Sequence, residues 1–244
     1  MLDVFFLGYV HFFAVLLPAL AVALVTMGAT QASLSPTETR VAVLVPAILL
    51  GAWYAIANHM SQTNVFNVPA TLAEPPIVLA FLFGGAFTLW ALARLTAIGR
   101  AVTDRLDLGL LAAFQIPRVM GALFLLGWAA GVIPWQFALL AGLGDIWAGI
   151  AGYQAWQAVR RNAPDARRKL VQANVIGIGD FVVAVFMGIT TSEGFAHLWA
   201  HEAPNIINLH PLALFPGFFV PIFLAFHLIL ISRLRHSSAI PAAA

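Results

Sequence analysis

Two aspartates stand in the middle of apolar stretches that are long enough to cross a membrane, and they are the clearest candidates for chemistry in this sequence. Each ends a Gly-x-Gly-Asp string, Gly-Leu-Gly-Asp at 142–145 and Gly-Ile-Gly-Asp at 177–180. A carboxylate at that depth is costly and is rarely present without a partner or a function. Asp145 and Asp180 are therefore predicted to belong to a buried site.

Small residues at spacings of three and four share a helix face with each aspartate. They are Ala138, Gly142, Gly149 and Gly152 beside Asp145, and Ala173, Gly177, Ala184 and Gly188 beside Asp180. Such stripes let helices approach closely in lipid, so both acids are expected to face protein, although the stripes alone are also ordinary packing surfaces. On two antiparallel helices, at 1.5 Å per residue, the acids differ in depth by only about 3 Å.

Arg118 is the third member of this candidate site, because it also lies within an apolar stretch. Its long guanidinium can reach either carboxylate, and Gln115 and Asn174 lie within two helical turns of these residues. One arginine neutralises one acid, so the other is expected to hold a proton or to bind a cation. We assign the chemistry to Asp145, Asp180 and Arg118. The alternative is an ion pair that only fixes helix register.

A second candidate site is rich in histidine and lies on the predicted outer side of the membrane, opposite the loops that carry the basic residues. Its members are His59, Glu193, His197, His201, Glu202 and His210, with His11 two turns inside the first span. On a helix, His197 and His201 would share one face and bind a metal, with His59, His210 and Glu202 as further ligands. Zinc, copper, iron or a haem would suit such ligands. Alternatively, residues around 195–201 form a short amphipathic helix on the membrane surface. His227 and His236 are expected to be packing or interfacial residues.

The Gly-x-Gly-Asp strings resemble the motif of the intramembrane aspartyl proteases, the presenilin-like and prepilin peptidase families. That resemblance implies that Asp145 and Asp180 act as a catalytic pair on adjacent helices and activate water for peptide hydrolysis. The surroundings differ from the family pattern. Gly144 and Gly179 precede the acids where the presenilin-like partner aspartate follows a tyrosine, and no lysine follows either motif.

The elements that must position these residues are membrane-spanning helices. About 20 apolar residues cross the hydrocarbon core, and this length predicts an all-α bundle of seven spans, at 4–27, 41–59, 75–96, 112–133, 136–158, 170–191 and 212–233. Gln115, Pro117 and Arg118 interrupt the start of the fourth span, and 103–113 is an alternative interfacial helix. We expect one transmembrane domain, 1–236, and a disordered tail, 237–244.

The basic residues predict the orientation of this bundle. In the seven-span arrangement every lysine and arginine except Arg118 falls on one side. Because basic loops stay in the cytoplasm, the N-terminus is predicted outside and the C-terminus inside, in a bacterial inner membrane.

Composition excludes several classes of function. The chain has 61% hydrophobic and 9% charged residues, far from the balance of a soluble domain, and it lacks cysteine. Its single lysine, Lys169, lies in a loop, so a retinal Schiff base in the last span is excluded. Nucleotide-binding loops and nucleic-acid-binding features are absent.

Three functions and one structural role therefore stay open. The first is a small proton-linked transporter of an unknown molecule or ion, with His59, His197 and His201 lining its outer opening. The second is a metal- or haem-binding redox enzyme or assembly factor, and the third an aspartyl protease. The fourth is an accessory subunit of a larger complex. Lipid is a certain partner of such a chain, and self-association is a possible one.

Overall fold

The structure, a computed structural model, describes residues 2–236, and every regular element in that range is a helix. In chain order these are α1 (Leu2–Gln31), α2 (Pro36–Gln62), α3 (Ile77–Leu95), α4 (Ala97–Thr103), α5 (Leu108–Ala113), η1 (Ile116–Gly121), α6 (Ala122–Ala129), α7 (Trp135–Arg160), α8 (Ala166–Thr191), η2 (Phe215–Phe219) and α9 (Val220–His236). η1 is a 3-10 helix and η2 a π-helical turn. The all-α prediction is confirmed for this range. The tail predicted to be disordered, 237–244, lies outside it.

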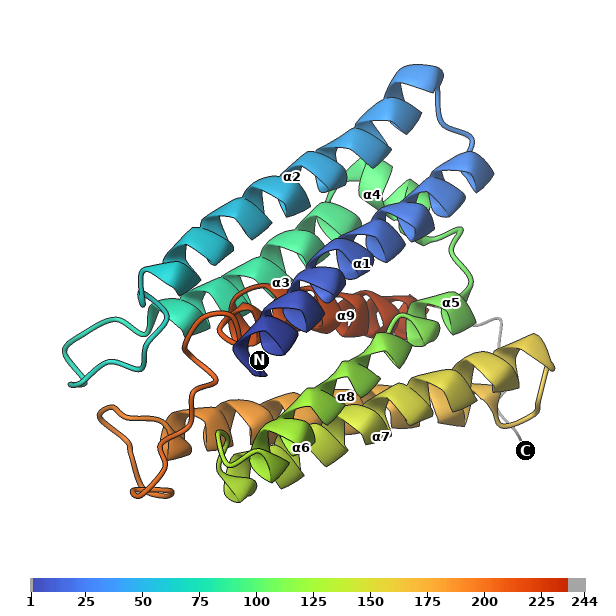
Figure 1. Cartoon of the computed structure of the whole chain (residues 1–244). Helices are drawn as coiled ribbons and strands as arrows, with labels where there is room; N and C mark the ends of the chain where they lie inside the picture. Colours follow the sequence, from blue (N-terminus) through green and yellow to red (C-terminus); the bar gives the residue numbers. More distant parts are fainter. Residues whose placement is uncertain (1, 237–244) are drawn as a thin grey trace.

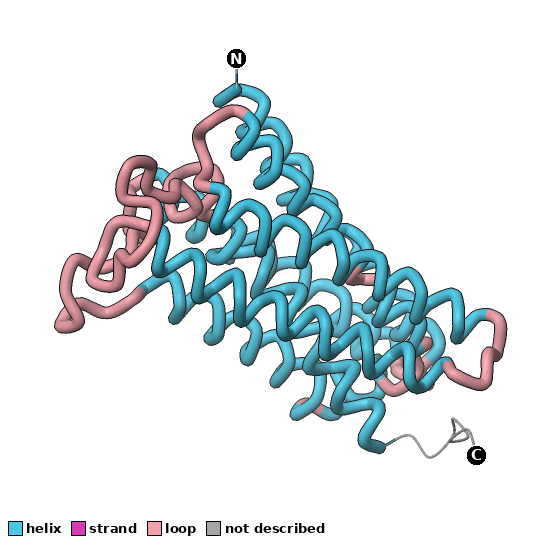
Figure 2. The backbone as a smooth tube through the Cα atoms, turned by 90° about the horizontal axis from the view of Figure 1, so that it is seen from below, coloured by secondary structure: helices cyan, strands magenta, loops and turns pink. Residues whose placement is uncertain are grey.

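The helices form three layers (Figure 1). α1 and α2 make the first layer, and the antiparallel pair α7 and α8 makes the third, with α5, η1 and α6 packed along it; α3 packs on α9 in the middle layer, and α4 contacts both α3 and the first layer. Between them runs α9, which contacts α3, α5 and α8. The long loops 63–76 and 192–214 lie together at one end of the bundle, as a second view also shows (Figure 2). We call the other end, with loops 32–35, 104–107 and 161–165 and the short helix α4, the basic end.

Six segments are long and apolar enough to span a membrane, and the fold is that of a multi-pass helical membrane bundle. They are Val4–Gln31, Pro36–Gln62, Ile77–Leu95, Leu108–Ala129, Ala166–Thr191 and Phe215–Arg235. The helix predicted as the fifth span, α7, is not among them. Its glutamines, its glycines and Asp145 lower its mean hydropathy, although at 26 residues it is as long as its antiparallel neighbour α8.

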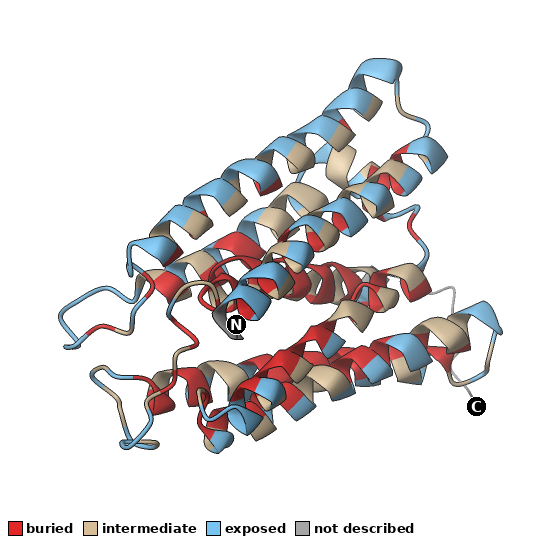
Figure 3. Cartoon of the chain, viewed as in Figure 1, coloured by how far each residue is buried: buried red, intermediate tan, exposed pale blue. Residues whose placement is uncertain are grey.

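The distribution of buried and exposed side chains is the one expected of a helical bundle surrounded by lipid. Large apolar side chains such as Phe12, Ile48 and Val182 point outward and are exposed on the surface of the bundle. Figure 3 shows this exposed surface along α2, whereas α9 is mostly buried. In the most apolar window of the η2–α9 segment 67% of the residues are buried, compared with 17% in α2. The core therefore lies around α9.

The fourth crossing segment starts earlier than predicted and is not one continuous helix. It starts at Leu108 rather than at 112, and the chain changes from α5 through η1 to α6. Pro117 occupies the first turn of η1 and has no N–H to donate, which explains the break. The alternative of an interfacial helix over 103–113 is wrong, because 108–113 begins the crossing segment and the short helix α4 ends at Thr103.

Candidate functional site

Arg118 lies at the centre of a buried polar cluster, where three of its nitrogen atoms meet different partners. Its side chain is 0% exposed. Nε donates to Asp145 Oδ1 at 2.8 Å, and Nη2 makes a short ion pair with Asp180 Oδ2. Nη1 donates to the carbonyl oxygen of Gly177 at 3.1 Å, and the guanidinium lies 3.7 Å from the centre of the Phe181 ring. The three residues singled out in the sequence therefore meet, and Arg118 contacts both acids rather than one.

Two further residues extend this cluster, and one of them was not expected there. His227 Nε2 lies 3.3 Å from Arg118 Nη1, and its Nδ1 lies 2.9 Å from Asn174 Oδ1. Arginine can only donate, so Nε2 accepts and the ring proton sits on Nδ1, which donates to Asn174. The Asn174 side-chain nitrogen donates in turn to the carbonyl oxygen of Leu170 at 3.0 Å. His227 is thus a neutral member of the site.

The assignment of His227 to packing is wrong. It was missed because one histidine in an apolar helix has no partner nearby in the sequence, and 109 positions separate it from Arg118. The available signal was its position: a polar ring in the middle of the last apolar segment needs hydrogen bonds in the bundle. The side chain of His236 lies outside the described residues.

The site carries more negative than positive charge. Arg118 supplies one positive charge and the two aspartates can supply two negative ones. Asp180 Oδ1 is buried and has no hydrogen-bond partner within residues 2–236. The Asp145 side chain is 14% exposed and that of Asp180 5%. A buried carboxylate oxygen without a partner is costly, so this geometry favours a proton or a cation at the site.

Glycines provide the space that this cluster occupies. A Cβ atom at Gly144 would overlap Asp180 Oδ1, one at Gly121 would overlap the Asp145 side chain, and one at Gly177 would overlap His227. A Cβ at Gly179, by contrast, would meet nothing within 4 Å. The two Gly-x-Gly-Asp strings are therefore not equivalent in structure. In the first, the glycine next to the acid makes room for the other acid, and in the second it faces open space.

The helices that carry the acids are continuous. Although glycines stand beside Asp145 and Asp180, α7 and α8 are uninterrupted α-helices. The break lies instead in η1, the segment that carries Arg118. Proline, rather than glycine, causes it, because a glycine inside a helix keeps its backbone hydrogen bond.

A small cavity adjoins the two acids and extends away from the basic end. Its volume is about 70 Å³, and apart from the acids its wall is mainly apolar, with Phe124, Phe137 and Phe215 on three different elements. Val68 and Asn208 line it as well, and both lie in the long loops of the opposite end. The cavity therefore connects the acids with that end of the bundle.

The predicted metal site is not assembled in the structure. No group of three or more histidine, aspartate or glutamate side chains that could hold a metal ion occurs among the side chains of residues 4–235. His197 and His201 are neighbours, with ring centres 4.6 Å apart, but His210 Nδ1 pairs with Ser61 Oγ at 3.1 Å. His59 lies in the last turn of α2 and is exposed, and so is Glu202. These five predicted ligands do not form one cluster.

The reason is that segment 192–214 does not form the helix expected around 195–201. Its backbone pairs with the end of α8 instead: the amides of Leu198 and Trp199 both donate to the carbonyl oxygen of Thr190, and that of Asn205 to Thr191. The amide of Phe195 donates to Pro69 in the other long loop at 2.8 Å. The segment therefore folds over the end of the bundle, and the helical spacing of the histidines has no meaning there.

Comparison with known proteins gives a family but no activity. No curated protein and no solved structure matches the chain. Residues 75–235 match the model of a family described as Domain of unknown function (DUF8737), and this range holds every residue of the polar cluster while it leaves out α1 and α2. Because the match covers well over half of the sequence, the chain belongs to this family of domains of unknown function.

Proposed function

We propose that the protein is a small proton-linked carrier with seven membrane crossings, in which one of the two buried aspartates takes up and releases a proton. The observation that carries this proposal is the fully buried Arg118, bonded to Asp145 and Asp180 at once. Buried charges within membrane segments commonly mark proton relays and ion pathways.

The second acid distinguishes this site from an ion pair that only fixes helix register. One carboxylate would be enough to neutralise Arg118, and a further buried carboxylate adds desolvation cost without adding a countercharge. Asp180 Oδ1 also lacks a partner among the described residues. A proton that arrives and leaves explains why both acids are present.

The cavity supports access of a proton from one end. Its volume of about 70 Å³ corresponds to roughly two water molecules, at about 30 Å³ each. Water in this space would connect the acids with Asn208 at the end opposite the basic loops. The broken segment around η1 supports the same proposal, because carriers commonly place their sites beside discontinuous helices near the membrane centre.

The proposed orientation places the basic end in the cytoplasm, in agreement with the distribution of arginine and lysine. The small cavity then opens toward the outer side. The membrane we propose is the cytoplasmic membrane of a bacterium.

The other functions have less support. In an aspartyl protease the two carboxyls share a proton with each other, whereas here one guanidinium is hydrogen-bonded to both. A metal or haem protein needs ligands that converge, and His59, His210 and the pair His197 and His201 have different surroundings.

Proton uptake into vesicles tests the proposal. The full chain is reconstituted in vesicles that contain a pH-sensitive dye, and a potassium gradient with valinomycin makes the inside negative. We expect proton uptake above that of protein-free vesicles, and loss of this excess in Asp145→Asn and Asp180→Asn.

Asp165→Asn is the matched control, because among the described residues the Asp165 carboxylate pairs with the exposed Arg168 at the basic end and with no member of the site. It should behave as the wild type. Proton uptake above the background that neither site variant reduces would contradict a proton-linked carrier that uses these aspartates.

A further inference from the structure

A second and much larger cavity lies between α1, α2, α3, α4 and α9, away from the aspartates. Its volume is about 420 Å³, and its wall is almost wholly apolar, with Leu24, Pro46, Leu89 and Ile222 from four of these helices. This volume falls within the range of small-molecule binding sites. Among the lining side chains only Thr96 and Thr103 carry polar groups, and their hydroxyls donate to the carbonyl oxygens of Leu92 and Gly99. The cavity therefore offers no free polar group to its occupant.

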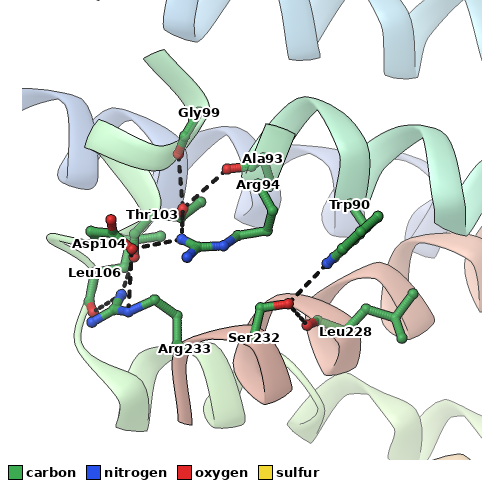
Figure 4. A network of polar contacts seen from close by, with 10 residues as sticks. All are labelled: Trp90, Ala93, Arg94, Gly99, Thr103, Asp104, Leu106, Leu228, Ser232 and Arg233. Carbon is green, nitrogen blue, oxygen red and sulfur yellow. Dashed lines mark hydrogen bonds and ion pairs between the residues drawn. The ribbon is translucent and has the colours of Figure 1, made fainter. Parts of the chain in front are cut away.

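Polar contacts join α3, α4 and α9 beside the cavity at the basic end (Figure 4). Arg94 on α3 makes an ion pair with Asp104 at 2.6 Å and donates to the Thr103 hydroxyl at 2.8 Å. Arg233 on α9 donates to the carbonyl oxygens of Thr103 and Leu106. These bonds hold α4 and the residues after it against α3 and α9.

The side toward the lipid is open. Val41 and Val45 on α2 line the cavity and are 42% and 45% exposed, and Thr96 and Ala97 beside them are exposed as well. Val41 and Val45 belong to a segment that is long and apolar enough to span a membrane, so their exposed side chains would face acyl chains and the occupant would enter sideways from the bilayer.

Two arginines are next in sequence to residues that line the cavity. Arg40 precedes the lining residue Val41 on α2, and Arg100 follows the lining residue Gly99 on α4, which packs against α2. Both are exposed, and neither has a carboxylate partner among residues 2–236, whereas Arg94 and Arg233 are engaged with Asp104. Unpaired basic residues beside an apolar cavity between membrane helices fit the phosphate of an anionic lipid.

We propose that this cavity binds one acyl chain of an anionic phospholipid, whose phosphate contacts Arg40 and Arg100. The apolar wall accepts the chain, the lateral opening admits it, and the two arginines select the headgroup charge. Bound lipid would fill the space between the first layer and α9. It would thereby join α1 and α2, which lie outside the matched family range, to the rest of the bundle.

Native mass spectrometry of the full chain tests the proposal. Detergent-solubilised protein is stripped of lipid and titrated with phosphatidylglycerol or phosphatidylcholine. We expect one tightly held phosphatidylglycerol per chain and weaker phosphatidylcholine binding. In Arg40→Gln/Arg100→Gln the affinity for phosphatidylglycerol should fall about thirtyfold, from the contribution of two arginines near a membrane surface.

The matched control pair is Arg161→Gln/Arg167→Gln, which removes two arginines from the same end but away from the cavity. It should bind phosphatidylglycerol as the wild type does. Equal losses of phosphatidylglycerol affinity in the two double variants would show a general effect of charge. An unchanged affinity in Arg40→Gln/Arg100→Gln would show that these arginines do not bind the headgroup. Either result overturns the proposal.

The site for the acyl chain is tested separately by Ala225→Leu, which adds bulk to the cavity wall. Its control is Ala52→Leu on the exposed side of α2. We expect the first variant alone to bind both lipids more weakly. Wild-type affinity in a folded Ala225→Leu protein would show that the acyl chain lies elsewhere. All of these variants are compared at equal helix content by circular dichroism.

Discussion

At the scale of single residues, the site depends on the shape of arginine and on the absence of side chains around it. The planar guanidinium of Arg118 directs Nε to one acid, Nη2 to the other and Nη1 to a backbone carbonyl. A lysine carries all its donors on a single nitrogen atom, so it cannot place them at the three separate positions that Nε, Nη1 and Nη2 occupy. Gly144 and Gly177 leave the volume that Asp180 and His227 occupy. The site therefore needs both the charged side chains and the glycines that leave room for them.

Gly144 and Gly179, the glycines directly before the two aspartates, allow a test of this requirement for space. They stand in the same sequence motif but have different surroundings in the structure. Gly144→Ala would push Asp180 away from Arg118, and we expect it to destabilise the protein by about 1–3 kcal/mol, as overpacking in a core does. Gly179→Ala meets open space, and we expect a neutral or slightly stabilising effect, because alanine favours a helix. Thermal unfolding in detergent distinguishes them. Similar midpoints for the two variants would contradict the close approach of α7 and α8 at Asp180.

At the scale of elements, apolar length was sufficient to predict most helices, but local sequence gave no guide to segment 192–214. Runs of apolar residues predict α1, α2, α3, α8 and α9 because a membrane requires them. Gln115, Pro117 and Arg118 correctly indicated an interruption, because a proline cannot donate within a helix. The segment 192–214 has no such periodicity. Its course depends on hydrogen bonds to Thr190, Thr191 and Pro69, which are contacts of the folded bundle.

This segment also contains a pH-sensitive contact. Burial lowers the pKa of His210 below its usual 6.5, and the nearby His11, with ring centres 6.2 Å apart, lowers it further. The folded state therefore binds fewer protons than the unfolded state, so this contact stabilises fully above pH 6.5 and less as the pH falls through the folded pKa. We expect hydrogen exchange in 205–214 to increase at acidic pH. His210→Gln should reduce this dependence, and His59→Gln, on the exposed end of α2, should not.

At the scale of the whole molecule, the depth of the two aspartates along their helices could be predicted from the sequence, but the rotation of each helix about its own axis could not. Counting residues along antiparallel helices placed Asp145 and Asp180 at one level, and the structure joins both to Arg118. Which faces meet depends on packing across the bundle, so the contact with His227 on α9 could not be predicted from spacing. The single predicted domain and the orientation of the bundle in a membrane stay predictions.

Whether α7 crosses the membrane decides between seven crossings and six. It lies antiparallel to α8, which has the same length and is apolar enough to span a membrane, so we expect α7 to cross as well. Loops 130–134 and 161–165 then lie on opposite sides of the membrane.

Because the chain has no cysteine, single cysteines report these sides directly in intact cells treated with a membrane-impermeant maleimide. We expect labelling of Ala70→Cys and Ala130→Cys, and protection of Ser33→Cys and Ala163→Cys until the membrane is opened. Labelling of both Ala130→Cys and Ala163→Cys before opening would mean that α7 does not cross. Asp145 would then not lie inside the bilayer, and the proton-linked carrier would lose the membrane position on which it depends. Labelling of Ser33→Cys and Ala163→Cys with protection of the other two would reverse the orientation and place the small cavity on the cytoplasmic side.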